Sequence, residues 1–328
     1  MTTTIAEPTG ATAPIVSDLP SLGAGHRACL GCGEALSCRL ALDAARKVVD
    51  GRVIVANATG CLEVFSSSYP YSSWNVPWIH SLFENAPAVA SGIAAGLRAL
   101  GRAGKRTDDI RVIGQGGDGG TADIGLQALS GMFERGDDVL YICYDNEAYM
   151  NTGIQRSGLT PAGARTMTTP IVTQGGQESL DEENAAFGQG NIRPKKDMVA
   201  VALAHHVPYI ATASIGYYGD LERKLKQAIT IRGPRYIHVH VPCPLGWGFD
   251  PKLTIQLAKL AVLTGLFPVV EYQEGNLTKV RKLRRRPPID EYLKPQARFA
   301  HLFKSDAGAE QLESVRAVAE ANVEHYGL

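Results

Sequence analysis

A glycine-rich stretch, Gly116-Gly117-Asp118-Gly119-Gly120, is the part of the sequence best suited to bind an anion. It follows an apolar run at 110–113 and precedes a helical pattern at 121–134. Glycines allow backbone N–H groups and a helix N-terminus to come close to a phosphate group. We therefore expect a strand, a glycine turn and a helix that together bind a phosphate.

A second pair of polar residues, Asp145-Asn146, follows the apolar run at 139–144, and Asn146 lies 28 positions after Asp118. In a parallel sheet both residues would emerge at the same carboxyl edge, where open α/β sheets bind ligands. Their oxygens suit Mg²⁺ bridging a diphosphate. A GDG sequence alone also occurs in ordinary tight turns. GDG followed one helix and one strand later by Asn resembles the thiamine diphosphate motif, so we expect that cofactor.

Four of the six cysteines are placed where they could converge. Cys29 and Cys32 form a CxxC loop, whereas Cys61 and Cys243 each stand in a turn just after a predicted strand. Thiolates meeting at the sheet edge could hold Zn²⁺ or an iron–sulfur cluster, and the spacing does not choose between them. A thioredoxin-like redox pair would explain the CxxC alone, but not Cys61 and Cys243.

The other two cysteines, Cys38 and Cys143, fall inside a predicted helix and a predicted strand. We expect both to be small buried thiols.

The elements that must position these residues alternate between strand and helix, which predicts an α/β fold with a mainly parallel sheet and helices on both faces. The stretch at 65–79 is aromatic and broken by Ser and Pro, and we expect a long ordered loop there. The stretch at 151–196 is loop-like, and so long a segment is usually functional or mobile. The expected helices are 34–48, 83–100, 121–134, 197–206 and 218–231, and the expected strands are 52–56, 110–113, 139–144, 207–212 and 235–241.

Three parts are expected along the chain: a flexible N-terminal arm at 1–24, an α/β domain at 25–245 that binds the cofactor and the cluster, and a C-terminal extension at 246–328 that packs on the domain or on partner subunits. The extension is expected to contain a helix at 251–264, a hairpin at 269–280 and a helix at 307–325. Its basic run at 281–286 is read as a solvated face or as a docking surface for an acidic partner.

The balance of 33 Lys and Arg against 33 Asp and Glu gives no general attraction to nucleic acid or to an anionic membrane. No apolar run is long enough to span a bilayer. The first 20 residues lack the basic start and apolar middle of a signal peptide. We therefore expect a cytoplasmic protein with reduced or metal-bound cysteines.

Several longer segments match a known family: GHRACLGCGEAL, YPYSSWNVPWIH, GGDGGTADIGLQALSGMFERG, YDNEAYMNTGIQRSGLTP and FDPKLTIQLAKLA. They resemble the thiamine-diphosphate-binding β chain of pyruvate:ferredoxin oxidoreductases, and the match runs from about 25 to 301. The resemblance implies a [4Fe–4S] cluster on Cys29, Cys32, Cys61 and Cys243. It implies Mg²⁺ on Asp118, Asn146 and the backbone carbonyl of Ala148, with the diphosphate near Gly117, Gly119, Gly120, Asn151 and Thr152.

The resemblance also implies an activity and partners. A 2-oxo acid, pyruvate first, is oxidatively decarboxylated to acyl-CoA and CO₂, with the thiazolium acting as electron sink and electrons leaving through the cluster. Phenylglyoxylate, a branched 2-oxo acid or oxalate are alternative substrates, and a zinc-binding scaffold subunit is the alternative of another class. The implied partners are companion α-, γ- and δ-type subunits, ferredoxin or another electron acceptor, and coenzyme A.

The resemblance implies that the carboxylate that activates the thiamine pyrimidine lies on a companion chain. We find no second α/β unit here to bind the pyrimidine. Glu63 and Glu84 are the local alternatives. His80 is expected to be a packed side chain near the site and not a catalytic acid.

Overall fold

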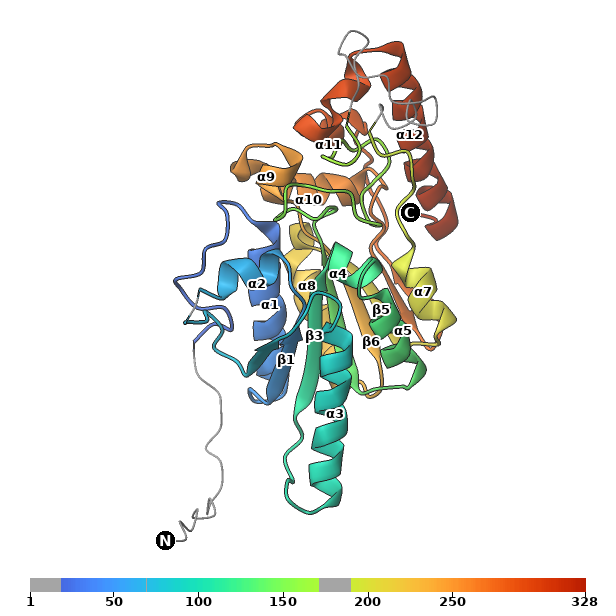
Figure 1. The fold of residues 1–328 in the computed structure, drawn as a ribbon. Coiled ribbons are helices and arrows are strands. Elements are labelled where there is room, and N and C mark those ends of the chain that lie inside the picture. The colour runs from blue at the N-terminus through green and yellow to red at the C-terminus, as the bar shows by residue number, and fades with distance from the viewer. Residues whose placement is uncertain (1–18, 69, 171–189) are drawn as a thin grey trace.

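The computed structural model of the chain describes residues 19–68, 70–170 and 190–328. An eight-stranded sheet runs through the molecule in the order β2-β1-β3-β4-β6-β5-β7-β8 (Figure 1). The first six strands in this order pair in parallel, and β7 and β8 are antiparallel. The strands are β1 (Val53–Asn57), β2 (Trp78–His80), β3 (Arg111–Gly117), β4 (Val139–Asp145), β5 (Tyr209–Ser214), β6 (Arg235–His240), β7 (Val270–Gln273) and β8 (Asn276–Val280).

The middle of the sheet is closed to solvent. Every residue of β4, β5 and β6 is buried. Parallel strands covered on both faces are typically near-continuous apolar runs, which is how these segments stand out in the sequence. The polar residues that end β4 are therefore held on a rigid support.

Helices cover both faces of the sheet, as predicted. The apolar core on one face contains residues of α1 and α8, and the core on the other face contains residues of α3, α5 and α7. The helices of the described ranges are α1 (Gly33–Val48), α2 (Cys61–Ser66), α3 (Ala86–Arg102), α4 (Asp118–Ala122), α5 (Leu126–Glu134), α7 (Met198–Ala204), α8 (Tyr218–Thr230), α9 (Pro244–Trp247), α10 (Thr254–Leu263), α11 (Asp290–Leu293) and α12 (Asp306–Tyr326), with 3₁₀ turns η2 (Ile215–Tyr217), η3 (Pro251–Leu253) and η4 (Ala297–Phe303).

The C-terminal part of the chain has an apolar core of its own. This core joins α9, α10, α11, η4 and α12 around the buried side chains of Trp247, Leu293 and Phe299. The predicted hairpin is β7 and β8, and it extends the main sheet by pairing with β5. The domain boundaries given above remain predictions.

The helix expected at 121–134 was predicted wrongly. α4 begins at Asp118 itself, and the chain leaves the helical path before α5 begins at Leu126. Gly125 lies in this break, where an added Cβ would approach the carbonyl oxygen of Gly120 to 2.0 Å. Because Gly120 and Gly125 approach each other so closely, the helix is interrupted there, although the apolar pattern of the sequence continues across the break.

The aromatic stretch at 65–79 is less irregular than expected. Its first residues belong to α2, and its end forms β2, which pairs in parallel with β1 so that His80 lies opposite Asn57. A three-residue strand at the sheet edge is too short to give a periodic pattern, which is why the sequence did not reveal it.

Two predicted segments lie partly outside the described residues. They are the N-terminal arm, of which 1–18 are not described, and the loop at 151–196, of which 171–189 are not described. Over the described ranges, every helix is too short or too polar to cross a lipid bilayer.

Candidate functional site

The glycine turn lies at the carboxyl edge of the sheet, as the sequence predicted. β3 pairs with β4 up to Gly117 opposite Tyr144, so that Asp118 and Asp145 follow on neighbouring strands. A Cβ on Gly119 would lie 2.2 Å from the ring of Tyr149. Glycine is therefore required here for the turn to pack against the loop that follows β4.

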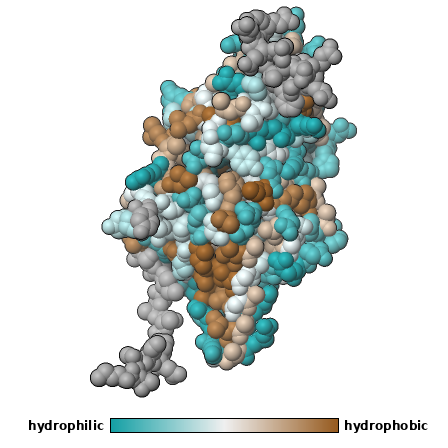
Figure 2. All heavy atoms as spheres, in the orientation of Figure 1, coloured by the Kyte–Doolittle hydropathy of each residue, from teal (hydrophilic) through white to brown (hydrophobic). Residues whose placement is uncertain are grey.

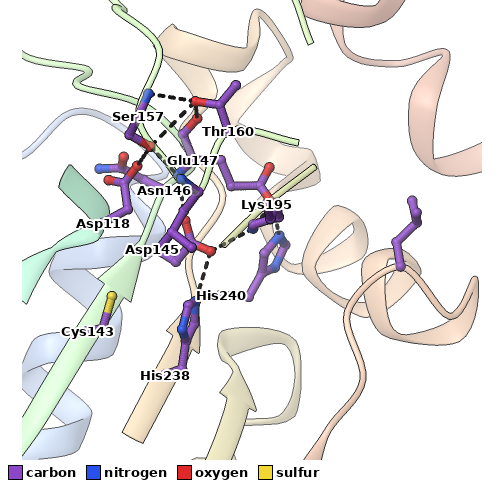
Figure 3. Close-up of polar contacts among 12 residues, drawn as sticks. Asp118, Cys143, Asp145, Asn146, Glu147, Ser157, Thr160, Lys195, His238 and His240 are labelled. Carbon is purple, nitrogen blue, oxygen red and sulfur yellow. Dashed lines mark hydrogen bonds and ion pairs between the residues drawn. The ribbon is translucent and has the colours of Figure 1, made fainter. Parts of the chain in front are cut away.

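Asp118 is held in place by a hydrogen bond from Ser157 Oγ to its Oδ2 (Figure 3). The Ser157 backbone N–H donates to Thr160 Oγ1 at 2.9 Å, and Thr160 Oγ1 donates to the Glu147 carbonyl at 2.7 Å. Burial and the nearby charge of Asp145 raise the pKa of Asp118 well above its usual range. A bound divalent cation would instead lower the pKa of Asp118 and keep its carboxylate ionised. The buried carboxylate therefore fits a magnesium ligand.

Asn146 has one amide atom fixed and the other without a partner. Its Nδ2 donates to Glu34 Oε2 at 3.0 Å. Its Oδ1 is buried and has no hydrogen-bond partner among the described residues. Because buried polar atoms are rarely left unpaired, this oxygen fits the role of a ligand to a cation such as Mg²⁺.

The loop that carries Asn146 and Ala148 is anchored by buried charges. Lys195 Nζ lies 2.7 Å from Asp145 Oδ2 and 2.7 Å from Glu147 Oε1 (Figure 3). Arg298 donates to Glu147 at 2.6 Å, and His238 Nε2 lies 2.9 Å from Asp145 Oδ2. Burial acts to raise the pKa of Asp145, but Lys195 and His238 outweigh it and hold the pKa well below its usual range.

One narrow cavity of about 60 Å³ is bordered by all the residues predicted for Mg²⁺ and the diphosphate. They are Gly117, Asp118, Gly119, Gly120, Asn146, Ala148, Asn151 and Thr152. The sequence thus predicted correctly which residues meet there. Their roles as ligands stay predictions.

The four predicted cysteines meet in a neighbouring cavity of about 190 Å³, bordered by Cys29, Cys32, Cys61 and Cys243. The backbone N–H of Ala35 donates to Cys32 Sγ and that of Gly246 to Cys243 Sγ, each at 3.4 Å. Such N–H to sulfur bonds tune iron–sulfur clusters. Over the residues that the structure describes, no three His, Cys, Asp or Glu side chains are placed to hold one metal ion.

Burial raises the pKa of Cys32 to about 12 and that of Cys243 to about 11. Without a metal both groups are thiols at neutral pH. An iron–sulfur cluster would bind them as thiolates.

Cys38 and Cys143 have the buried positions that the sequence predicted. Both are fully buried, within α1 and β4. Cys38 Sγ donates to the Ala35 carbonyl at 3.2 Å, and neither thiol borders the cavity of the other four cysteines.

Glu34 is a site residue that the sequence reasoning missed. It is 2% exposed, it lies in the first turn of α1, and it borders both cavities. Burial raises its pKa to about 7, although the hydrogen bond from Asn146 acts in the opposite direction. The available signal was its position directly after Cys32-Gly33, which places it beside the predicted cluster.

The three remaining candidates lie at the margin of the site. His80 Nε2 is 2.8 Å from Thr59 Oγ1, and the His80 ring stacks on Trp78, which agrees with a packed side chain near the site. Glu63 and Glu84 border neither cavity among the described residues. The structure therefore gives no local support for either as the activating carboxylate.

Comparison with known proteins agrees with this geometry. Residues 58–239 match the family model of the thiamine pyrophosphate enzyme, C-terminal TPP binding domain. The chain is 51% identical over 304 residues to pyruvate synthase subunit PorB of Methanosarcina barkeri, covering 93% of this chain and 96% of that protein. It is 45% identical over 305 residues to ketoisovalerate oxidoreductase subunit VorB of Pyrococcus horikoshii, covering 90% and 93%.

A solved structure has the same fold at much lower identity. It is the 2-oxoglutarate:ferredoxin oxidoreductase from Magnetococcus marinus, with a TM-score of 0.53 and 19% identity, covering 85% of this chain and 86% of that one.

The fold and the site together define a thiamine diphosphate-binding α/β subunit. More narrowly, the chain belongs to the β subunits of the 2-oxoacid:ferredoxin oxidoreductases, and it is one subunit of a multi-subunit oxidoreductase. The family resemblance and the fold class predicted from the sequence are confirmed.

Proposed function

We propose that this chain is the β subunit of a pyruvate:ferredoxin oxidoreductase and holds both Mg²⁺–thiamine diphosphate and a [4Fe–4S] cluster. The observation that carries the proposal is that the two cavities share a wall. Glu34, Cys61, Asn146 and Asn151 border both of them. A cofactor in one cavity and a cluster in the other would be close neighbours, as electron transfer between them requires.

Each group has a defined set of residues to hold it. Asp118, Asn146 and the Ala148 carbonyl would bind Mg²⁺, and Gly117, Gly119, Gly120, Asn151 and Thr152 would surround the diphosphate. Cys29, Cys32, Cys61 and Cys243 would bind the cluster. When bound, thiamine diphosphate supplies an electron sink for decarboxylation and the cluster supplies a one-electron acceptor.

The activating carboxylate is proposed to come from a companion subunit. Asp118 and Glu34 are the carboxylates that border the cofactor cavity in the described part of the chain, and they are engaged by Ser157 and Asn146. The exposed face of α3 supports a partner there: Figure 2 shows apolar surface over this helix, and a Cβ added to Gly92 or Gly96 would meet nothing within 4 Å.

Pyruvate is the proposed substrate because the four pyruvate synthase relatives from methanogens are 50–52% identical. The Pyrococcus relatives do not separate the two substrates, since their pyruvate synthase subunits are 44% identical and their ketoisovalerate oxidoreductase subunits 45–46%. Ferredoxin and coenzyme A are proposed as acceptors of the electrons and of the acyl group. We place the protein in the cytoplasm, in keeping with four cysteines available to bind a cluster.

Iron and acid-labile sulfide analysis tests the cofactor assignment, since a zinc scaffold would contain neither. A panel of 2-oxo acids given to the whole complex, with CO₂ release followed in the presence of ferredoxin and coenzyme A, tests the substrate. Preferential turnover of pyruvate supports the proposal, and preference for a branched 2-oxo acid would reassign the chain to the ketoisovalerate class.

A further inference from the structure

Glu34 stands between the two proposed cofactors and touches a proposed ligand of one of them. It follows Cys32 by two positions on α1, whereas Asn146 follows β4 on the neighbouring part of the sheet edge. The hydrogen bond from Asn146 Nδ2 to Glu34 Oε2 joins these two elements across 112 positions of sequence.

This hydrogen bond decides which atom of Asn146 faces the cavity. In this bond the amide nitrogen of Asn146 donates and Glu34 Oε2 accepts, so the nitrogen points at Glu34. The amide oxygen must then point elsewhere, and Oδ1 is the buried atom left without a partner among the described residues. Mg²⁺ binds oxygen and not amide nitrogen.

We infer that Glu34 is a positioning residue for the metal: it holds the Asn146 side chain in the one orientation that presents oxygen to Mg²⁺. The inference rests on the proposed function, because it assumes that Mg²⁺–thiamine diphosphate binds at Asp118 and Asn146. Residues that orient metal ligands typically change metal affinity by 10- to 100-fold when they are replaced.

Two substitutions at Glu34 separate orientation from packing. Glu34→Ala removes the acceptor, whereas Glu34→Gln has nearly the same shape and keeps a carbonyl oxygen that can accept from Asn146. We expect Glu34→Ala to weaken Mg²⁺-dependent binding of thiamine diphosphate by about 10-fold or more, and Glu34→Gln to bind within about 3-fold of wild type. Calorimetric titration of the assembled complex measures both values without requiring turnover.

A double-mutant cycle shows whether Glu34 acts through Asn146. If it does, Glu34→Ala should have no further effect on Mg²⁺ affinity once Asn146 is already Ala, because coupled residues do not contribute independently. Ser37→Ala is the matched control. Ser37 is a fully buried polar residue on the same helix that borders neither cavity, and we expect wild-type Mg²⁺ affinity.

These results distinguish a failure of the inference from a failure of the proposed function. A wild-type complex that binds no Mg²⁺–thiamine diphosphate would refute the proposed function. If wild type binds, the inference is overturned when Glu34→Ala binds as tightly as wild type, when Glu34→Gln is as weak as Glu34→Ala, or when the effects of Glu34→Ala and Asn146→Ala add. Iron content and thermal midpoint, measured on every variant, identify any that is misfolded. If Glu34→Ala is misfolded, Glu34→Met replaces it in both backgrounds, because Met is of similar length but is only a weak hydrogen-bond acceptor.

Discussion

At the scale of single residues, the site combines atoms that need a cation with atoms that fix them in place. Asp118 and Asn146 are buried and border one narrow cavity, and Ser157 and Glu34 hold them by hydrogen bonds. The sequence motif identified the first pair because their spacing is a recurrent pattern. The motif did not reveal that Ser157 and Glu34 contact this pair, because those contacts form only when the chain folds.

Asp118→Ala should weaken Mg²⁺-dependent binding of thiamine diphosphate by at least about 100-fold, since the loss of a proposed metal ligand should exceed the loss of a residue that orients one. Fluorescence or calorimetric titration of the variant measures this. Asp108→Ala, in an exposed turn that borders neither cavity, is the control and should bind normally. Near-normal affinity of Asp118→Ala would remove Asp118 from the metal site.

The six cysteines should divide into two groups when each is replaced by Ala. Loss of Cys29, Cys32, Cys61 or Cys243 should lower the iron content and the visible absorbance, because these thiols border one cavity. Loss of Cys38 or Cys143 should leave iron unchanged, and Cys143→Ala should lower the free energy of unfolding by about 1 kcal/mol through a small cavity. A cluster that survives loss of Cys243 but not of Cys38 would contradict the assignment.

At the scale of secondary-structure elements, the ends of the parallel strands β3 and β4 position the site residues. The segment before α7 stabilises the end of β4 and the loop that follows it. Lys195 lies in that segment and bridges two buried carboxylates, one at the end of β4 and one in the following loop. Alternating strand and helix patterns were enough to predict this part of the sheet. The break between α4 and α5 was missed because it depends on a contact between Gly120 and Gly125, and not on periodicity.

Lys195→Met should lower the free energy of unfolding by about 3 kcal/mol, because it leaves Asp145 and Glu147 buried with less compensating charge. Urea denaturation followed by circular dichroism measures the change. Lys195→Arg keeps the charge and should be closer to wild type. Equal stability of Lys195→Met and wild type would show that Arg298 and His238 compensate the two carboxylates without Lys195.

The exposed glycines of α3 provide a test of the partner face. Gly92→Ala should stabilise the helix by up to about 1 kcal/mol, since the added Cβ meets no neighbour within 4 Å. Gly92→Leu should also leave the chain folded, but it should block close approach of a companion subunit. Co-purification with the companion chains measures this, and assembly of Gly92→Leu as complete as that of Gly92→Ala would place the interface elsewhere.

At the scale of the whole molecule, we propose that the chain carries the diphosphate half of a shared active site. The sequence predicted the fold and the family correctly, and GDG, the following Asn and the dispersed cysteines all map to one sheet edge. It could not show that the two cavities share a wall, since that depends on how the loop before α1 packs against the turn after β6. That packing includes the hydrogen bond from the Gly33 N–H to the Pro242 carbonyl.

The isolated chain should therefore release no CO₂ from any 2-oxo acid, even after reconstitution with Mg²⁺, thiamine diphosphate and the cluster. The reason is that no carboxylate placed to activate the pyrimidine borders the cavity in the described part of the chain, apart from Asp118 and Glu34, which are already engaged. Adding the companion chains should restore turnover with a one-electron dye. If the isolated chain turned over at the rate of the complex, the carboxylate that activates the pyrimidine would instead be assigned to Glu63 or Glu84.

The central claim is that electrons released at the thiamine site leave through the cluster held by this chain. The most direct test is electron paramagnetic resonance of the complex after addition of pyruvate, with Mg²⁺ and thiamine diphosphate present and with ferredoxin and coenzyme A omitted. The account predicts a reduced-cluster signal that requires thiamine diphosphate and disappears when this chain carries Cys243→Ala. Decarboxylation of pyruvate with an unchanged signal in the Cys243→Ala complex would contradict it.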